Sequence, residues 1–314
     1  MLYAGPKLEN PAGTDAFEAG GGGGGSSDPL VLADNAVAPS APASGIKLYA
    51  IDKADRRRPG WVGPSGIDTS IQEFIGANKI GFWSAGGNST TGFNNATPGI
   101  MLWNFGHTTQ GTVTARNVAA SAGAGRIFNS TRRLGFAQGA ATSAGTRHGL
   151  SQFALLNGFE YIARFGISGL PSSGSAGYWA GLQTGTNALT STFMLNGAAG
   201  GVGAYLSTAG GFQIVHAVSS GSGYTVHKTL NATTFPSSTA SIDLYELRLF
   251  CPPGATTMAW RVERLNTGDY DEGLITADLP ASTALLMPQI ACAGSAVSLG
   301  VAIDVVSQYI VTDF

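Results

Sequence analysis

The sequence predicts an all-β protein, a β-sandwich or jelly roll that follows an extended N-terminal arm. Short runs in which apolar and polar residues alternate recur along the chain, and Gly-rich turn segments separate them about every ten residues. Helical patterns longer than two turns are scarce, which argues against a fold built from βαβ units. These two observations indicate many short strands packed as two sheets.

Residues 1–45 form the first expected unit, an extended attachment arm rich in Gly, Ala and Pro. Six consecutive glycines and five prolines exclude a long helix there. Because ordering glycine costs much conformational entropy, we expect the arm to become ordered only against another protein. Its candidate anchors are Leu30, Val31 and Leu32.

Residues 46–75 form a transition segment. The run IKLYAI alternates like a short strand, and DKADRRRPG is typical of a turn. Asp68, followed by Gln72 and Glu73, is a candidate cap for one short helix.

Three arginines stand beside a tryptophan in this segment. An arginine fork can bind an anionic glycan or a phosphate, or it can pair with carboxylates of an adjoining subunit. We favour the pairing, because a cyclic oligomer would repeat the arginines around its axis. The candidates for contacts with another subunit or another protein are Arg56, Arg57, Arg58 and Trp61.

Residues 76–314 form the expected sandwich domain. In MAWRVERL, Trp260 and Val262 alternate with Arg261 and Glu263, which places apolar and charged side chains on opposite faces of one strand. The strands that we expect are NKIGFWS, TVTARNVA, FEYIARFGIS, SAGYWAGLQTG, TFMLNGA, GFQIVHAVSS, SIDLYELRLFC, TTMAWRVERLNTG, ALLMPQIACA and AIDVVSQYIVTDF.

Charge is scarce and unevenly distributed. Charged residues are 11% of the chain, and residues 165–227 contain none. Either these strands are buried on both faces or a partner subunit covers them, and we favour the partner. A formal net charge of −2 provides no field for nucleic acid, so we expect no nucleic-acid partner, and we expect no membrane insertion.

Signatures of catalysis and of cofactor binding are missing from the sequence. We find no phosphate-binding loop, nucleophile elbow or HExxH motif, so we expect no enzyme, no metal and no cofactor. The acidic run DYDEG at residues 269–273 could hold Ca²⁺ or act as a glycosidase pair, but a solvated hairpin turn is favoured. Cys251 and Cys292 are expected to be two buried thiols, with one cross-strand disulfide as the alternative.

Aromatic residues in or near loops rich in Gly and Asn are candidates for stacking on sugars. Their rings can pack on sugar faces while neighbouring polar groups bind hydroxyls, although packing in the core is the commoner role of any one ring. The candidates for binding a glycan or receptor are Trp103, Phe105, His107, Trp83, Tyr178 and Trp179.

Several segments carry a family resemblance from about residue 46 onward. WVGPSGIDT and LYELRLF followed by WRVERLNTG are the most specific, with FNSTRRLGF, GFEYIARFGI and VAIDVVSQYIVTDF in the same order. Together they resemble tailed-bacteriophage virion proteins of the tail fibre or tail-associated kind. The resemblance implies a lectin-like β-sandwich, a homotrimer and an N-terminal part that attaches to other virion proteins, and it transfers no catalytic residue.

The expected function is therefore that of a virion structural protein assembled in the bacterial host cytoplasm. Its sandwich would bind a host surface glycan or protein. A purely structural decoration or adaptor of the head, neck or tail is the alternative, and a depolymerase that acts on host glycan is a third.

Overall fold

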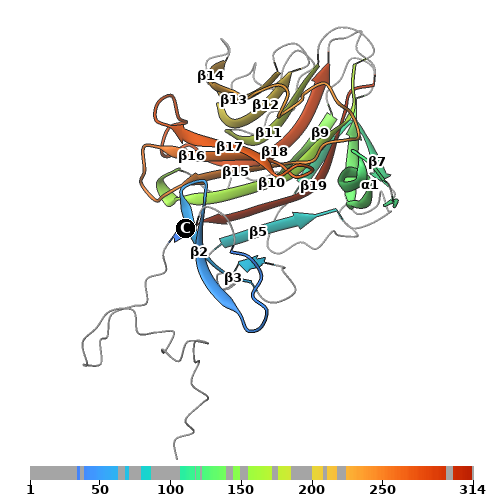
Figure 1. Cartoon of the computed structure of the whole chain (residues 1–314). Coiled ribbons are helices and arrows are strands. Elements are labelled where there is room, and N and C mark those ends of the chain that lie inside the picture. The colour runs from blue at the N-terminus through green and yellow to red at the C-terminus, as the bar shows by residue number, and fades with distance from the viewer. Residues whose placement is uncertain are drawn as a thin grey trace, which may run out of the picture.

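The computed structural model of the chain describes fourteen stretches of the sequence. They are residues 34–35, 39–62, 68–70, 79–85, 107–116, 118–120, 122–138, 144–148, 155–171, 176–184, 200–207, 211–217, 224–294 and 300–312. Two large antiparallel sheets pack face to face, and a smaller sheet lies beside them (Figure 1). The predicted all-β sandwich is thereby confirmed.

The first large sheet has eight strands. In spatial order they are β17 (Asp269–Ile275), β16 (Met258–Arg264), β15 (Tyr245–Cys251), β10 (Phe159–Gly169), β19 (Ala302–Thr312), β8 (Arg133–Ala137) and β7 (Thr112–Arg116), and β5 (Lys79–Ser84) also pairs with β19. Its outer face, which points away from the other sheet, carries ion pairs. Glu246 accepts hydrogen bonds from Arg164 at 2.6 Å and from Arg248 at 2.7 Å, and Arg261 contacts Glu272 at 2.9 Å.

The second large sheet has seven strands, which lie above the first sheet in Figure 1. In spatial order they are β14 (Tyr224–Thr229), β13 (Gly211–Ala217), β12 (Gly201–Ser207), β11 (Ala176–Thr184), β18 (Leu286–Gly294), β9 (Ala144–His148) and β6 (His107–Gln110). No Asp, Glu, Lys or Arg occurs in β11, β12, β13 or β18. The two sheets therefore differ in chemistry on their outer faces.

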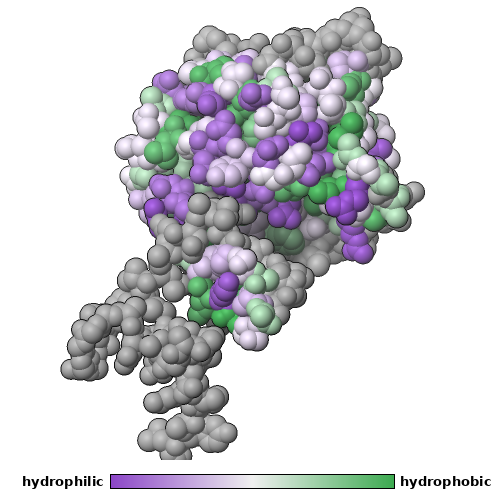
Figure 2. Space-filling model, in the orientation of Figure 1, coloured by the Kyte–Doolittle hydropathy of each residue, from purple (hydrophilic) through white to green (hydrophobic). Residues whose placement is uncertain are grey.

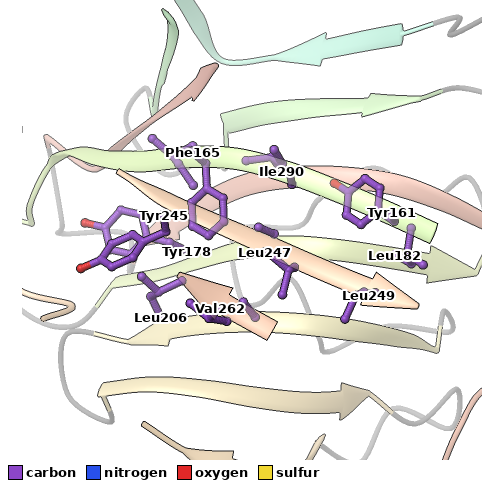
Figure 3. Close-up of a cluster of buried hydrophobic side chains, with 14 of the residues drawn as sticks. Tyr161, Phe165, Tyr178, Leu182, Leu206, Tyr245, Leu247, Leu249, Val262 and Ile290 are labelled. Carbon is purple, nitrogen blue, oxygen red and sulfur yellow. The ribbon is translucent and has the colours of Figure 1, made fainter. Parts of the chain in front are cut away.

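The core lies between the sheets and is rich in aromatic rings (Figure 3). The rings of Phe212 on β13 and Tyr245 on β15 bridge the sheets with centroids 5.2 Å apart. The Tyr178 hydroxyl donates a hydrogen bond to the Gly169 carbonyl at 2.7 Å. Burial of these large rings stabilises the sandwich.

The smaller sheet consists of β1 (Asp34–Asn35), β2 (Lys47–Lys53), β3 (Arg56–Val62) and β4 (Asp68–Ser70). β2 and β3 form an antiparallel hairpin around a turn at Ala54 and Asp55, both with positive φ. The only helical segments among the described residues are α1 (Arg126–Ser130) and the 3₁₀ turn η2 (Leu155–Asn157). Neither is long and apolar enough to cross a membrane.

Three local predictions were wrong. The three arginines lie in β3 rather than in a turn, because they pair in register with β2. Asp68 lies in β4 instead of capping a helix. The acidic run at 269–273 belongs to the edge strand β17, where Glu272 lies opposite Arg261. The expected strand TFMLNGA lies outside the described residues.

Two strands of the uncharged segment are buried without a partner subunit. Every residue of β12 is buried, and so is every residue of β11 except Thr184, within a single chain. The alternative, burial on both faces, is therefore what β11 and β12 show, whereas Tyr224 and Val226 on β14 are exposed. Cys251 on β15 and Cys292 on β18 are both buried thiols, as predicted.

Candidate functional site

The predicted glycan-binding residues lie in different environments. Trp83 on β5 and Tyr178 on β11 are buried in the core between the sheets, so packing is the role that the structure gives both rings. Trp179 is also fully buried, but it belongs to a different cluster. His107 lies in β6, and the structure does not describe its side chain. Trp103, Phe105 and the anchors Leu30, Val31 and Leu32 lie outside the described residues.

Trp179 lies on the outer face of the seven-stranded sheet because successive strand residues point to opposite faces. Its neighbour Tyr178 faces the core. Trp179 lies directly opposite Tyr205 on β12 and Ala291 on β18, and the three belong to one buried cluster. None of these residues belongs to the core cluster between the two sheets.

Glycines form the floor beneath the two rings. A Cβ built at Gly181 would lie 2.8 Å from Cζ2 of Trp179, and one at Gly177 would lie 2.6 Å from Cε2 of Tyr205. Gly203 is the cross-strand partner of Gly181. The rings therefore lie along the sheet, over positions where any other residue would place a side chain.

Two glutamine side chains accompany the rings. Gln289 on β18 lies opposite Gly181 and is fully buried, and neither its Oε1 nor its Nε2 has a hydrogen-bond partner in the described part of the chain. Gln213 on β13 lies opposite Tyr205. Its Oε1 and the Nε1 of Trp179 also have no hydrogen-bond partner in the described part of the chain. Leaving a buried polar group unsatisfied costs about 1–3 kcal/mol.

The rings reach the sheet edge at Tyr224 on β14. Its ring lies 5.5 Å from that of Tyr205, edge to face at 62°, and its exposed fraction is 38%. Burial raises the pKa of Tyr205 to about 12, although a hydrogen bond with Ser207 opposes the shift. The Tyr205 hydroxyl therefore remains protonated at neutral pH and can donate as well as accept.

We call this set of residues the aromatic–amide face; its members are Trp179, Tyr205, Gln213, Tyr224 and Gln289. Amide and hydroxyl groups that both donate and accept suit the hydroxyls of an uncharged ligand, and rings suit its apolar faces. Among the described residues, no group of three or more His, Cys, Asp or Glu side chains could hold a metal ion. Sequence reasoning identified only Trp179 of this face, although the alternation of Gly with aromatic residues in GYWAG and GVGAYL was a usable signal.

The predicted attachment residues lie on the hairpin. Arg56 and Arg58 form ion pairs with Glu160 on β10, which is almost completely buried. Arg57 lies 3.4 Å from Asp52 and 3.7 Å from Asp55. The carboxylates predicted to belong to an adjoining subunit thus belong to the same chain, because β3 folds back along β2 and against β10. Trp61 is partly exposed.

Comparisons with solved structures give distant similarities. A protein of unknown function from Shewanella oneidensis MR-1 is 11% identical, with a TM-score of 0.47 over 77% of this chain and 90% of that chain. A peanut lectin is 10% identical, with a TM-score of 0.43 over 67% and 92%. Alginate lyase vAL-1 from a Chlorella virus is 10% identical, with a TM-score of 0.38 over 63% and 90%.

Similarity at this level concerns the arrangement of strands, and no ligand or activity transfers with it. No protein-family model matches the sequence, and no curated protein matches it.

Proposed function

We propose that the protein binds an uncharged glycan through the aromatic–amide face. The observation that carries this proposal is Gln289, whose buried amide has neither of its hydrogen bonds among the described residues. An unsatisfied buried amide lowers the stability of the fold, and its presence is explained if a bound ligand supplies the missing hydrogen bonds. Sugar hydroxyls both donate and accept, so they can satisfy the amide and the indole Nε1 together.

The absence of charge favours a neutral ligand over an acidic one. The strands β11, β12, β13 and β18 carry no Asp, Glu, Lys or Arg. An acidic sugar would find no arginine or lysine to pair with on these strands. Tyr224 is the accessible end of the face, and a ligand reaches Gln289 and Trp179 only if the face opens, since both are closed to solvent.

The test is binding of the full chain to an array of neutral and acidic glycans, followed by calorimetry on the best neutral ligand. Tyr224→Ala should weaken binding about tenfold or more, which corresponds to about 1.4 kcal/mol. Tyr270→Ala removes an exposed ring from the edge of the other sheet and should leave affinity unchanged. Absence of neutral-glycan binding, or equal affinity of the two variants, would refute the proposal.

The finer proposal places this binding on a virion, with host recognition as the purpose. The support is the sequence resemblance to tail fibre and tail-associated proteins, which also favours a homotrimer and binding over catalysis. Deleting residues 1–45 should leave a folded protein that binds glycan but no longer enters particles. Normal incorporation of the truncated chain would contradict the attachment role of the arm.

The alternative is a decoration or adaptor of the particle that binds no receptor. The burial of Trp83 and Tyr178 supports this alternative, because two of the predicted sugar-stacking rings pack in the core instead. Incorporation into particles together with a completely negative glycan array and unchanged host adsorption would select this alternative. A depolymerase would in addition shorten host polysaccharide, and purified protein that leaves its length unchanged would exclude that activity.

A further inference from the structure

Two histidines lie at the edge of the seven-stranded sheet where β14 pairs with β13. His216 on β13 points to the core side of the sheet, because Ile214, two residues before it, belongs to the core. His227 on β14 has no partner residue in the register, which steps from Val226 directly to Lys228 at a β-bulge. The two imidazole rings are neighbours, with centroids 6.5 Å apart.

The surroundings of the two rings suit neutral imidazoles. His216 is only 6% exposed, and neither its Nδ1 nor the Nε2 of His227 has a hydrogen-bond partner among the described residues. A neutral imidazole has one N–H, whereas the charged form has two that need acceptors. Two charged rings would also repel each other at this distance. Protonation is therefore unfavourable while β14 stays paired with β13.

The charged groups around the pair oppose this effect only in part. Burial lowers the pKa of both rings, His227 adds to the effect at His216, and Asp278 opposes it at both. Lys228, next to His227, pairs with Asp271 on β17 at 3.7 Å. Figure 2 shows many hydrophilic residues on the visible surface of the sandwich, and exposed carboxylates ordinarily titrate below pH 5. Between pH 7 and 5 the two histidines are thus the groups that we expect to change charge at this edge.

The first half of β14 is weakly held. Residues 224–227 pair with β13 on one side only, because β14 is the edge strand. Tyr224 and Val226 are 38% and 41% exposed, so little burial holds them in place. Leu230 fixes the other end of the strand, since it is buried in the core and its N–H donates to the Phe212 carbonyl at 2.9 Å. The first half can therefore leave β13 while the sandwich stays folded.

We infer that acidification detaches residues 224–227 from β13 and thereby weakens the glycan binding proposed above. This regulation rests on the proposed function, because Tyr224 is the accessible end of the aromatic–amide face and moves away from Tyr205 when the strand detaches. The detached histidines regain water and their ordinary pKa of about 6.5, so each proton favours the detached state. Together they can shift the equilibrium by up to about a hundredfold per pH unit below 6.5.

The first test is hydrogen–deuterium exchange of the full chain at pH 7 and 5, with EDTA present and rates corrected for the intrinsic effect of pH. Protection of the amides of residues 224–227 should fall by about tenfold or more at pH 5, while protection of β11 stays unchanged. His216→Gln/His227→Gln should abolish this loss, because glutamine takes up no proton. His148→Gln, on β9 toward the opposite edge of the sheet, should keep the wild-type response. Unchanged protection in wild type, or the same loss in the double variant, would overturn the inference.

Asp278→Asn gives a test that needs no substitution of a histidine. The residue is exposed, and asparagine tolerates its positive φ of 56°. Asp278 favours the charged histidines while the strand is paired, so its removal should increase the loss of protection at pH 5. A loss equal to or smaller than that of wild type would contradict the proposed role of the two histidines.

The second measurement is calorimetry with the best neutral glycan at the same two pH values. Wild-type affinity at pH 5 should fall to about that of Tyr224→Ala at pH 7, and the double histidine variant should bind equally at both. If the strand detaches but the affinity stays unchanged, the regulation is refuted and glycan binding stands. If no neutral glycan binds at either pH, the proposed function fails and the regulation with it, whereas exchange still decides whether acid detaches the strand.

Discussion

Gln289 on β18 lies directly opposite Gly181 on β11, with its whole side chain buried and its amide without a hydrogen-bond partner in the described part of the structure. In a sheet, such a position is ordinarily occupied by an apolar residue. Trp179, two residues from Gly181, has an indole N–H in the same condition. The two polar groups thus lie on the same face of the seven-stranded sheet, on the neighbouring strands β18 and β11.

Replacing Gln289 with leucine should raise the stability of the fold. The change removes an unsatisfied buried amide and keeps an apolar side chain of comparable size, so we expect a gain of about 1 kcal/mol in the free energy of unfolding. The same variant should lose glycan binding. Denaturant unfolding and calorimetry would measure the two effects.

Gln308 on β19 supplies the matched control. It is also fully buried, but its Oε1 accepts a hydrogen bond from the Tyr161 hydroxyl at 2.8 Å. Gln308→Leu should therefore lower stability by about 1–2 kcal/mol, because it leaves that hydroxyl unsatisfied. Equal losses in the two variants would argue against a functional role for the Gln289 amide.

Asp304 on β19 binds arginines from the two neighbouring strands β8 and β7. It is fully buried, and it accepts hydrogen bonds from Arg133 at 2.9 Å and from Arg116 at 3.2 Å. Asp304→Asn should lower the free energy of unfolding by about 3 kcal/mol, since it leaves two cations without their counter-charge. Asp271→Asn breaks the exposed contact with Lys228 at 3.7 Å and should cost less than about 1 kcal/mol.

A methyl group at Gly181 should disturb the seven-stranded sheet itself. Its Cβ would lie 2.5 Å from the carbonyl oxygen of Val202 and 2.7 Å from Cα of Gly203, and neither backbone atom can move without shifting a strand. We expect Gly181→Ala to cost about 2 kcal/mol or more in thermal or chemical unfolding. Gly273→Ala, whose Cβ would meet only the Trp260 side chain at 3.0 Å, should cost clearly less.

Two neighbouring histidines should make stability depend on pH below neutrality. The rings of His216 and His227 have centroids 6.5 Å apart. Burial lowers the pKa of both, His227 adds to the effect at His216, and Asp278 opposes it at both. Below the ordinary value of 6.5 the unfolded chain therefore binds more protons than the folded one.

The two histidines should leave the free energy of unfolding unaffected above pH 6.5. Below pH 6.5 it should fall by at most about 1.4 kcal/mol per pH unit for each histidine. His216→Leu should make the decline shallower, and unfolding curves between pH 7 and 5 would measure it. A slope that is the same in the variant would show that other groups cause the decline.

A second decline should follow at lower pH from Glu246. Burial alone would raise the pKa of this carboxyl, but Arg248 and Arg164 outweigh it and lower the pKa to about 2. Its stabilising contribution is thus present above 4.5 and is lost as the pH falls toward 2. Glu246→Gln should lower the free energy of unfolding at pH 7 and remove most of its decline at acidic pH, which unfolding curves at a series of pH values would measure.

Much of the sandwich could be predicted because its strands alternate clearly. In β10, β15 and β16, apolar residues face the core and charged residues lie on the opposite face of the sheet, so the alternation and the two faces were both evident from the sequence. The edge strand β17 was mistaken for a turn, because its acidic run resembles turn chemistry. Only its pairing with β16, which places Glu272 opposite Arg261, makes those residues a strand.

The amino-acid sequence by itself determined the fold class, the uncharged segment and the cluster of arginines. The tertiary structure decided which of two adjacent rings, Tyr178 or Trp179, faces the core, since a strand that is apolar on both sides carries no signal of direction. It also decided that Arg58 meets Glu160, more than a hundred residues away. Alternation and charge are local properties of the chain, whereas partners across a sheet or between sheets are set by how distant strands pack.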